Sequence, residues 1–299
     1  MSTMPSINTP VLLVGSHGML AAAMRRSLSR RKVTDIHFVD RDECDVTSDN
    51  DVAATFDRVR PKLVINCSAY TAVDKAEVEE EIATQLNGAA VGRMAAVCRE
   101  HGATFVHFGT DFVFDGQADT PYGETDEPAP VSAYGRSKLA GDKALFDSGG
   151  DDWLLLRTAW LYGPWAGRPF PKVMVDAAKA GKPLRVVSDQ HGSPTLTIDL
   201  AETALDLLAG GHRGLFHVTG GGRTTWFDFT REILQQFKVT PKSLDPVTAA
   251  DWAAMRPDSA TRPAFSVLDT SKVEAALGRS MRDWKIALQD YRDLVAAEP

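Results

Sequence analysis

The chain has 299 residues, of which 43% are hydrophobic and 24% charged, a composition typical of a globular protein with a sizeable core. Its net charge is −7 and no block of lysine or arginine stands out, which argues against nucleic acid or an anionic membrane as a partner. No apolar stretch approaches the ~20 residues that span a bilayer, and residues 1–10 do not look like a signal peptide. The three cysteines lack metal-ligand spacing, so we expect free thiols in a cytoplasmic protein.

The first predicted element is a buried parallel strand at residues 11–14, which are all apolar. The turn Gly15-Ser16-His17-Gly18-Met19-Leu20-Ala21 follows and leads into a helical pattern that ends near residue 28. Glycines between a strand and a helix N-terminus let the backbone approach a cofactor pyrophosphate, which the free amides then bind. An ordinary strand–helix turn remains the alternative, because the spacing is Gly-x-x-Gly-x-x-Ala.

A second predicted strand, at residues 36–39, ends at Asp40 and Arg41. An acid at this distance from the glycine turn binds the ribose hydroxyls of NAD, whereas a neighbouring arginine accepts the 2′-phosphate of NADP. Because the chain has both residues, the choice between NADH and NADPH stays open.

Predicted strands and helices continue to alternate strictly. We expect a helix at 51–60, a strand at 63–67, a helix at 79–101 and a strand at 104–108. This alternation predicts a Rossmann-type doubly wound parallel sheet, with ligands at the carboxyl ends of its strands. Thr110 lies at one such end, where its hydroxyl either hydrogen-bonds a substrate oxygen or caps the following turn.

Tyr134 and Lys138 stand four residues apart at the start of the next predicted helix, so their side chains share one face. Free tyrosine has a pKa of about 10, and an ammonium one turn away is expected to lower it toward the range of efficient acid–base catalysis. The phenol can then give a proton to a ketone oxygen while a hydride reaches the carbon. Roughly one chain in four of this composition has Tyr-x-x-x-Lys by chance, so the pair needs support from other residues.

Beyond a predicted strand at 153–160 the strict alternation stops. The remaining expected elements are a loop at 163–169, a short strand at 184–190, a helix at 200–208, a strand at 214–218 and a helix at 227–237. We therefore expect an NAD(P)-binding domain over residues 1–160, with later returning segments at roughly 195–222. Residues 161–299 would mainly form a smaller, interleaved C-terminal substrate domain.

Several stretches occur in order along nearly the whole chain and carry a family resemblance. They are Ala72-Val73-Asp74-Lys75-Ala76-Glu77, Gly109-Thr110-Asp111-Phe112-Val113-Phe114, Tyr134-Gly135-Arg136-Ser137-Lys138-Leu139-Ala140-Gly141, Asp189-Gln190-His191-Gly192-Ser193-Pro194-Thr195, Thr224-Thr225-Trp226-Phe227-Asp228 and Arg262-Pro263. Together they resemble the extended short-chain dehydrogenase/reductase superfamily and, within it, the dTDP-4-dehydrorhamnose reductase family. The resemblance implies reduction of dTDP-4-dehydrorhamnose to dTDP-L-rhamnose with NADPH or NADH.

The resemblance also implies roles for individual residues. Tyr134 would be the catalytic acid, Lys138 its partner and a ligand of the nicotinamide ribose, and Thr110 the residue that polarises the ketone. The cofactor-binding residues expected from the turn, the spacing and the resemblance are Gly15, His17, Gly18, Met19, Leu20, Asp40, Arg41, Asp45, Val46, Ser68, Ala69, Tyr70, Tyr134 and Lys138. The expected substrate-binding residues are Thr110, Asp111, Trp160 and Arg262, although Trp160 could instead pack in the core and Arg262 lie on the surface.

The chain departs from the family pattern in two places. Ala21 replaces the third glycine, which the superfamily tolerates. Arg168-Pro169-Phe170-Pro171 stands where the family usually has Asn-Phe, which bears on sugar selectivity. Some members bind Mg²⁺ between subunits and a homodimer is compatible with the resemblance, but no compact carboxylate cluster here demands the ion.

Two alternatives to this function stay open. One is a reductase of another nucleotide 4-keto-deoxysugar. The other is a non-catalytic, NADP-binding regulatory subunit of the same fold. The presence of Tyr134, Lys138 and Thr110 favours an enzyme with a small-molecule nucleotide sugar as its partner, because a binding subunit need not keep all three.

Overall fold

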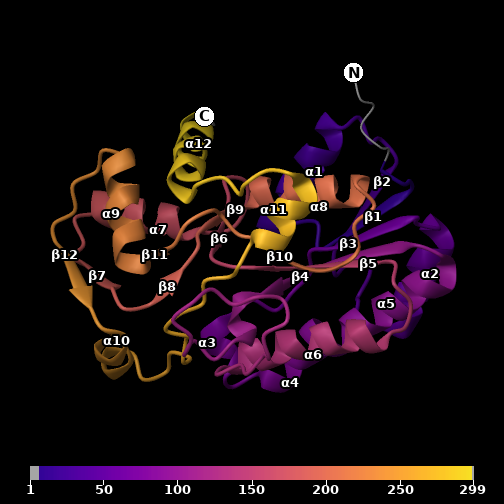
Figure 1. Cartoon of the computed structure of the whole chain (residues 1–299), viewed down its shortest axis with the longest axis horizontal. Coiled ribbons are helices and arrows are strands. Elements are labelled where there is room, and N and C mark those ends of the chain that lie inside the picture. The colour runs from indigo at the N-terminus through magenta and orange to yellow at the C-terminus, as the bar shows by residue number, and fades with distance from the viewer. Residues whose placement is uncertain (1–6, 298–299) are drawn as a thin grey trace.

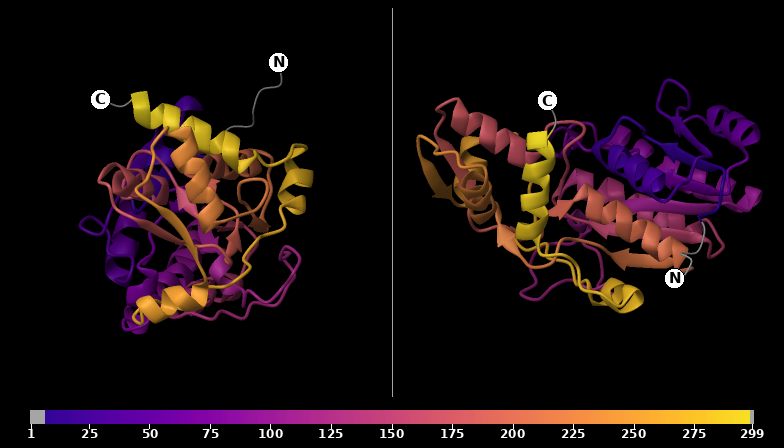
Figure 2. Two further views of the ribbon diagram at one scale, coloured as in Figure 1. Left: turned by 90° about the vertical axis from the view of Figure 1, so that its left-hand side faces the viewer. Right: turned by 90° about the horizontal axis from the view of Figure 1, so that it is seen from above.

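The computed structural model describes residues 7–297, and its main feature is a six-stranded parallel sheet between two layers of helices (Figure 1, Figure 2). From edge to edge the strands are β10 (Gly214–His217), β5 (Trp153–Thr158), β4 (Thr104–Thr110), β3 (Leu63–Asn66), β1 (Val11–Val14) and β2 (Ile36–Val39). The chain goes from β1 to β2 on one side and returns on the other side as β3, so the strand order reverses at β1. This confirms the predicted Rossmann-type doubly wound sheet and places a ligand crevice at the carboxyl ends of β1 and β3.

Both faces of the sheet are buried, which explains why residues 11–14 are apolar at every position. Val11 and Leu13 belong to the hydrophobic cluster on one face, and Leu12 and Val14 to the cluster on the other. The helices that contribute to the first cluster are α1 (Met19–Arg30), α8 (Thr197–Ala209) and α11 (Ser271–Leu277); those that contribute to the second are α2 (Asp49–Val59), α5 (Ala90–His101) and α6 (Ala133–Asp147).

The helical stretch predicted over residues 79–101 is confirmed from residue 80 to residue 101, and it contains a π-helical turn. The segment consists of α4 (Glu80–Thr84), the π-turn (Gln85–Ala89) and α5. Helix α6 lies so close to the π-turn that a Cβ on Gly141 would be 2.0 Å from the carbonyl oxygen of Asn87. Asn87 also accepts from the N–H of Tyr70 (2.8 Å) and donates to Ser137 Oγ (2.9 Å). The turn thus ties the loop after β3 to α6, as π-turns at functional sites often do.

The chain after residue 160 forms a second, smaller group of elements. Its strand pairs are β6 (Leu161–Tyr162) with β9 (Thr195–Leu196), β7 (Leu184–Val187) with β12 (Leu244–Val247), and β8 (His191–Gly192) with β11 (Thr224–Thr225). Its helices are α7 (Phe170–Lys179), α9 (Trp226–Gln236), α10 (Ala249–Met255) and α12 (Trp284–Ala297). The short helix α3 (Val73–Ala76) does not belong to this group, because it follows β3 in the first part of the chain. Because α8 and β10 join the large sheet, the two groups are interleaved; the domain boundary near residue 160 stays a prediction.

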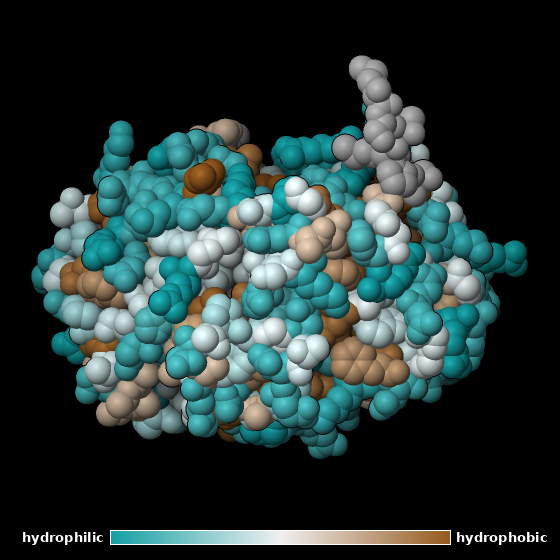
Figure 3. All heavy atoms as spheres, in the orientation of Figure 1, coloured by the Kyte–Doolittle hydropathy of each residue, from teal (hydrophilic) through white to brown (hydrophobic). Residues whose placement is uncertain are grey.

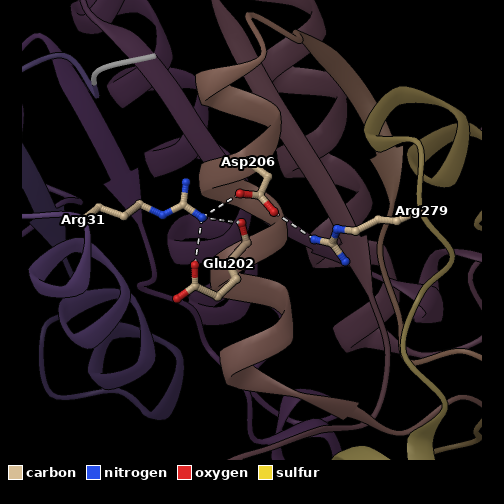
Figure 4. Close-up of polar contacts among 4 residues, drawn as sticks. All are labelled: Arg31, Glu202, Asp206 and Arg279. Carbon is tan, nitrogen blue, oxygen red and sulfur yellow. Dashed lines mark hydrogen bonds and ion pairs between the residues drawn. The ribbon is translucent and has the colours of Figure 1, made fainter. Parts of the chain in front are cut away.

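An ionic network fastens the returning helix α8 to α1 (Figure 4). Arg31, which follows α1, donates to Glu202 Oε2 (2.8 Å) and to Asp206 Oδ1 (2.7 Å). Arg279, which follows α11, donates to the other oxygen of Asp206 at 2.9 Å. One carboxylate on α8 therefore joins segments that are far apart in the sequence.

The face of the molecule in Figure 3 is mostly hydrophilic, and its apolar side chains lie in small separate groups. Scattered groups of this kind are normal for a protein surface. Within residues 7–297, no helix combines the length and the apolar character that a membrane crossing requires.

A buried ion pair holds α6 against the sheet. Arg157 of β5 donates from Nε to Asp142 Oδ2 of α6 at 2.9 Å, and the two side chains are only 2% and 0% exposed. Burial raises the pKa of Asp142, and the neighbouring Arg157 opposes that rise. Breaking a pair at this depth leaves a charge that neither water nor protein neutralises.

We expect Asp142→Leu to lower the free energy of unfolding by about 3–5 kcal/mol, because Arg157 would remain buried without its carboxylate. Asp176→Ala is the control, since it removes an exposed i,i+4 pair with Lys172 (3.0 Å) and should cost less than about 0.5 kcal/mol. Urea denaturation followed by circular dichroism measures both variants. Equal losses would contradict the assigned role of the buried pair.

Candidate active site

Two adjoining cavities open at the carboxyl ends of the central strands. The first, of about 440 Å³, lies between the glycine turn and the end of β2. The second, of about 650 Å³, lies beyond the end of β4 and against the start of α6. Both are lined by Gly18, Cys67, Ser68 and Ala69. Together they form one groove long enough for an extended ligand.

The glycine turn has the geometry of an anion-binding loop. Gly15 has a φ of +75°, and a Cβ there would lie 2.6 Å from the backbone nitrogen of Ser68, so only glycine fits. Gly18 caps α1 without a side-chain hydrogen bond. The first amides of the helix, at Met19 and Leu20, have no intrahelical partner and face the groove with the positive end of the helix dipole. These residues fit a dinucleotide pyrophosphate.

Asp40 and Arg41 line the far end of the first cavity, as do Asp45 and Val46. The carboxylate of Asp40 accepts from the N–H of Arg41 (2.8 Å) and of His17 (3.0 Å). Partial burial works to raise the pKa of Asp40, but these hydrogen bonds outweigh it and hold the pKa below its ordinary value. A carboxylate and a guanidinium are therefore both available at this end of the groove.

The second cavity brings together Thr110, Asp111, Tyr134 and Lys138. Thr110 ends β4, and its hydroxyl donates to Asp111 Oδ1 at 3.1 Å. The other oxygen of Asp111 is buried and has no hydrogen-bond partner in the described part of the chain. Burial raises the pKa of Asp111 to about 6. An unpaired buried acceptor beside a cavity is suited to bind a hydroxyl group of a ligand.

Tyr134 lies in the first turn of α6, which begins after the cap residue Ser132, whose Oγ accepts from Gly135 N at 3.1 Å. Burial raises the pKa of Tyr134 to about 12, while a hydrogen bond with the side chain of Thr110 opposes the rise. The prediction that Lys138 lowers this pKa is wrong for the ligand-free protein. The phenol is fully protonated at neutral pH, as a proton donor must be.

Lys138 makes its hydrogen bonds away from Tyr134. Its Nζ donates to the carbonyl oxygen of Phe108 (2.7 Å) and lies 3.3 Å from His107 Nε2. Burial lowers the pKa of Lys138 to about 8, although Asp142 works to raise it. The amine is therefore still mainly protonated at neutral pH, but it loses its proton at a lower pH than an ordinary lysine does.

Trp160 and Arg262 both line the second cavity. Trp160 has a φ of +47°, and its ring stacks on that of Trp226 with centroids 3.5 Å apart. Arg262 donates to Asp74 Oδ1 (2.7 Å) and to the carbonyl oxygen of Ala260 (3.1 Å). Both side chains are half-buried, so each combines structural contacts with a surface that a ligand can reach.

Tyr70 is the one expected cofactor residue that lines neither cavity. Its hydroxyl donates to Glu79 Oε2 (2.7 Å) and its N–H to Asn87 Oδ1 (2.8 Å). These bonds anchor the loop after β3, and a role of Tyr70 in cofactor binding stays a prediction.

The groove is also lined by Asn66, Thr47, Arg168 and Trp226, which were not among the site residues expected from the sequence. Trp226 was within reach, because it lies in one of the stretches that carry the family resemblance. A third cavity of about 460 Å³, lined by Phe170, Trp226, Trp252 and Arg262 among others, adjoins the second. Within residues 7–297, no three His, Cys, Asp or Glu side chains are grouped so that they could hold a metal ion.

Known proteins resemble this chain over nearly its whole length. A family model described as RmlD substrate binding domain matches residues 9–296. A probable dTDP-4,6-dihydroxy-2-methyloxan-3-one 4-ketoreductase of Streptomyces antibioticus is 39% identical, with 96% of each chain covered. The dTDP-4-keto-6-deoxy-D-glucose reductase of Streptomyces niveus is 36% identical, over 96% of this chain and 98% of the relative. The dTDP-4-dehydrorhamnose reductase of Burkholderia thailandensis is 34% identical, over 93% and 96%.

Solved structures similar to this chain include proteins of the same enzyme name. A dTDP-4-dehydrorhamnose reductase from Clostridium acetobutylicum superposes with a TM-score of 0.89 at 36% identity, covering 96% of this chain and 99% of that one. The enzyme of the same name from Bacillus anthracis, solved in complex with NADP, gives a TM-score of 0.87 at 30% identity, covering 94% and 97%. The chain belongs to the RmlD family of dTDP-4-dehydrorhamnose reductases.

Proposed function

We propose that this protein is an NAD(P)H-dependent reductase that converts the 4-keto group of a dTDP-4-keto-6-deoxy-L-hexose, dTDP-4-dehydrorhamnose, to the hydroxyl of dTDP-L-rhamnose. The observation that carries the proposal is that Thr110, Tyr134 and Lys138 line one cavity, which continues into the cavity of the glycine turn. The names of the relatives support the same reaction.

The groove fits a nicotinamide dinucleotide. The amides after Gly18 would hold the pyrophosphate, Asp40 or Arg41 the adenosine ribose or its 2′-phosphate, and Ser68 and Ala69 the middle of the molecule. When bound, the cofactor supplies the hydride that reduces the carbonyl carbon. The complex of the Bacillus anthracis enzyme with NADP supports this assignment.

The side chains of the second cavity supply the proton and the orientation. Tyr134 gives its proton to the ketone oxygen. The hydroxyl of Thr110 turns from Asp111 to this oxygen when the sugar is bound and donates to it, so negative charge never accumulates there. Asp111 accepts a sugar hydroxyl with its free oxygen. Lys138 holds the nicotinamide ribose and is the basic partner of Tyr134 as charge develops.

The third cavity is suited to the dTDP part of the substrate. Trp226 and Trp252 offer flat faces for the base, and Arg262 lies where this cavity meets the second. A guanidinium hydrogen-bonds a diphosphate with two parallel N–H groups. The sugar would then lie between Arg262 and Tyr134.

The proposal is tested by NADPH consumption with dTDP-4-dehydrorhamnose, followed by NMR of the product. A protein that oxidises NADPH with this sugar and forms dTDP-L-rhamnose fulfils it. Turnover of another dTDP 4-keto sugar alone would favour the second candidate, a reductase for a different deoxysugar. That candidate draws support from Arg168, which lines the second cavity at a place where the family pattern differs, and from the names of the two Streptomyces relatives.

NADP binding without turnover of any 4-keto sugar would instead indicate the regulatory-subunit alternative. We place the protein in the cytoplasm, an assignment that its free cysteines support. A homodimer stays a prediction that sedimentation can test.

Tyr134→Phe should lower kcat by roughly 10²–10⁴-fold, because the proton donor is lost while the ring remains. The KM for NADPH should change little, since the phenol hydroxyl acts mainly in the transition state. Steady-state kinetics at saturating sugar measures both constants. Near-normal turnover would remove Tyr134 from the mechanism.

Arg41→Ala should raise the KM for NADPH selectively, because only NADPH carries the 2′-phosphate that Arg41 would bind. Losing one hydrogen bond to a charged group should raise the KM for NADPH about 10-fold or more. We expect the parent to use both cofactors, since Asp40 and Arg41 both line the cavity. Equal effects on NADH and NADPH would mean that Arg41 does not face the phosphate.

Arg262→Ala and Trp160→Ala should each weaken binding of dTDP to the NADP-loaded protein by on the order of 1–3 kcal/mol. Arg231→Ala is the control, because Arg231 is an exposed arginine that pairs with Asp228 and lines neither the second nor the third cavity. Isothermal titration calorimetry gives the affinities, and thermal unfolding shows whether the variants are folded. Folded variants that bind dTDP as the parent does would place the nucleotide elsewhere.

A further inference from the structure

A chain of buried polar groups runs from the wall of the groove to the amine of Lys138. Ser68 donates to Asn66 Oδ1 from its N–H (3.0 Å) and from its hydroxyl (2.6 Å). Asn66 Nδ2 lies 3.1 Å from His107 Nδ1, and His107 Nε2 lies 3.3 Å from Lys138 Nζ. Asn66 and His107 are each 1% exposed and stand opposite each other on neighbouring strands. Water does not compete for these bonds.

The backbone of Ser68 fixes which group donates and which accepts along this series of hydrogen bonds. A backbone N–H can only donate, so the oxygen of Asn66 faces Ser68 and its NH₂ group faces His107. Nδ1 of His107 must then accept. Burial holds the pKa of His107 well below its ordinary value, so the imidazole is neutral and its single hydrogen is on Nε2. That hydrogen points at the amine of Lys138.

The amine of Lys138 meets two different groups. It donates to the carbonyl oxygen of Phe108 at 2.7 Å, and it faces the Nε2–H of His107. An uncharged amine can accept from Nε2–H with its lone pair, whereas an ammonium would oppose one donor to another. The chain of hydrogen bonds therefore orients the amine and favours its uncharged form.

We propose that His107 is a positioning residue for the reduction: its Nε2–H fixes the amine of Lys138 at the wall of the second cavity, and Asn66 sets the imidazole tautomer that makes this bond. The proposal rests on the proposed function, in which Lys138 is the partner of Tyr134. It assigns a task to two buried polar side chains that the mechanism otherwise leaves unused.

The other charged and titratable groups around Lys138 do not provide this orientation. Asp142 is one turn further along α6 and acts on Lys138 through its charge, but it is hydrogen-bonded to Arg157 of β5. Tyr134 and Thr110 line the second cavity, and Asp111 accepts from Thr110. Among the hydrogen bonds found within residues 7–297, those of Lys138 Nζ go to Phe108 and His107.

The first test reads the tautomer in the unmodified, ligand-free protein. Long-range ¹H–¹⁵N spectra distinguish the Nε2–H, Nδ1–H and doubly protonated forms, and His107→Gln identifies the signals of His107 among those of the seven histidines. We expect the Nε2–H form at neutral pH. An Nδ1–H or doubly protonated ring would overturn the proposal. Because no substrate is needed, this failure is distinguishable from failure of the proposed function, which would show as an inactive parent.

The second test compares two amides of different length. The amide nitrogen of His107→Gln can reach the position of Nε2, whereas that of His107→Asn reaches only the position of Nδ1. We expect kcat to fall roughly 100-fold in His107→Asn and roughly tenfold in His107→Gln, the range for a misplaced catalytic group, with the KM for NADPH within about threefold of the parent. Equal losses in two folded variants would make His107 a packing residue only.

A third variant, Asn66→Asp, should reverse the donor and acceptor roles along the series of hydrogen bonds. The carboxylate in Asn66→Asp can only accept, so it should draw the hydrogen of His107 to Nδ1 and leave Nε2 free to accept from a Lys138 ammonium. The expected results are the Nδ1–H or doubly protonated form in the ¹⁵N spectrum and a higher titration midpoint for the Lys138 Cε signal. An unchanged Nε2–H form in this variant would show that Asn66 does not set the tautomer.

Discussion

Close contact between α6 and the elements beneath it is the constraint on which the site depends, because this helix carries both Tyr134 and Lys138. The buried pair of Asp142 and Arg157 fixes the helix from the side of the sheet. From the side of α5 and the π-turn, small residues let the helices approach: a Cβ on Gly88 would lie 3.1 Å from Ala140, and one on Gly92 would lie 2.9 Å from Ala144. A helix fixed by charge on one side and by steric fit on the other can hold a phenol to within fractions of an ångström.

The position of α6 also explains why the side chains of Tyr134 and Lys138 have such different environments. Tyr134 is near the helix start, where burial is the main cause that raises its pKa and the charges of Asp111 and Asp142 add to the rise. Lys138 is one turn deeper and reaches the strand beneath it at Phe108. One helix thus presents a protonated phenol of raised pKa to the cavity and an amine of lowered pKa to the sheet. Two groups whose pKa values are pushed apart in this way can divide a proton transfer between them.

The sequence was sufficient for features that depend on neighbours along the chain. The all-apolar run at residues 11–14, the glycine turn and the alternation of strands with helices correctly predicted the sheet and its crevice. Contacts between distant segments were beyond its reach. The partner of Lys138 is 31 positions away at His107, the ring that covers Trp160 belongs to Trp226, and the π-turn depends on the fit of Gly141 against Asn87.

Asn66 ends β3 and His107 lies within β4, and both occupy buried positions where apolar residues would give a more stable core. Burying an amide and an imidazole is costly unless every polar atom is paired, and here the pairing is complete only if the row from Ser68 to Lys138 has one direction. Ser68 lines both halves of the groove, so the row begins at the ligand site and ends at the amine. Reversing any one bond of this row would set a donor against a donor or an acceptor against an acceptor. The hydrogens on these four residues therefore have to be arranged together.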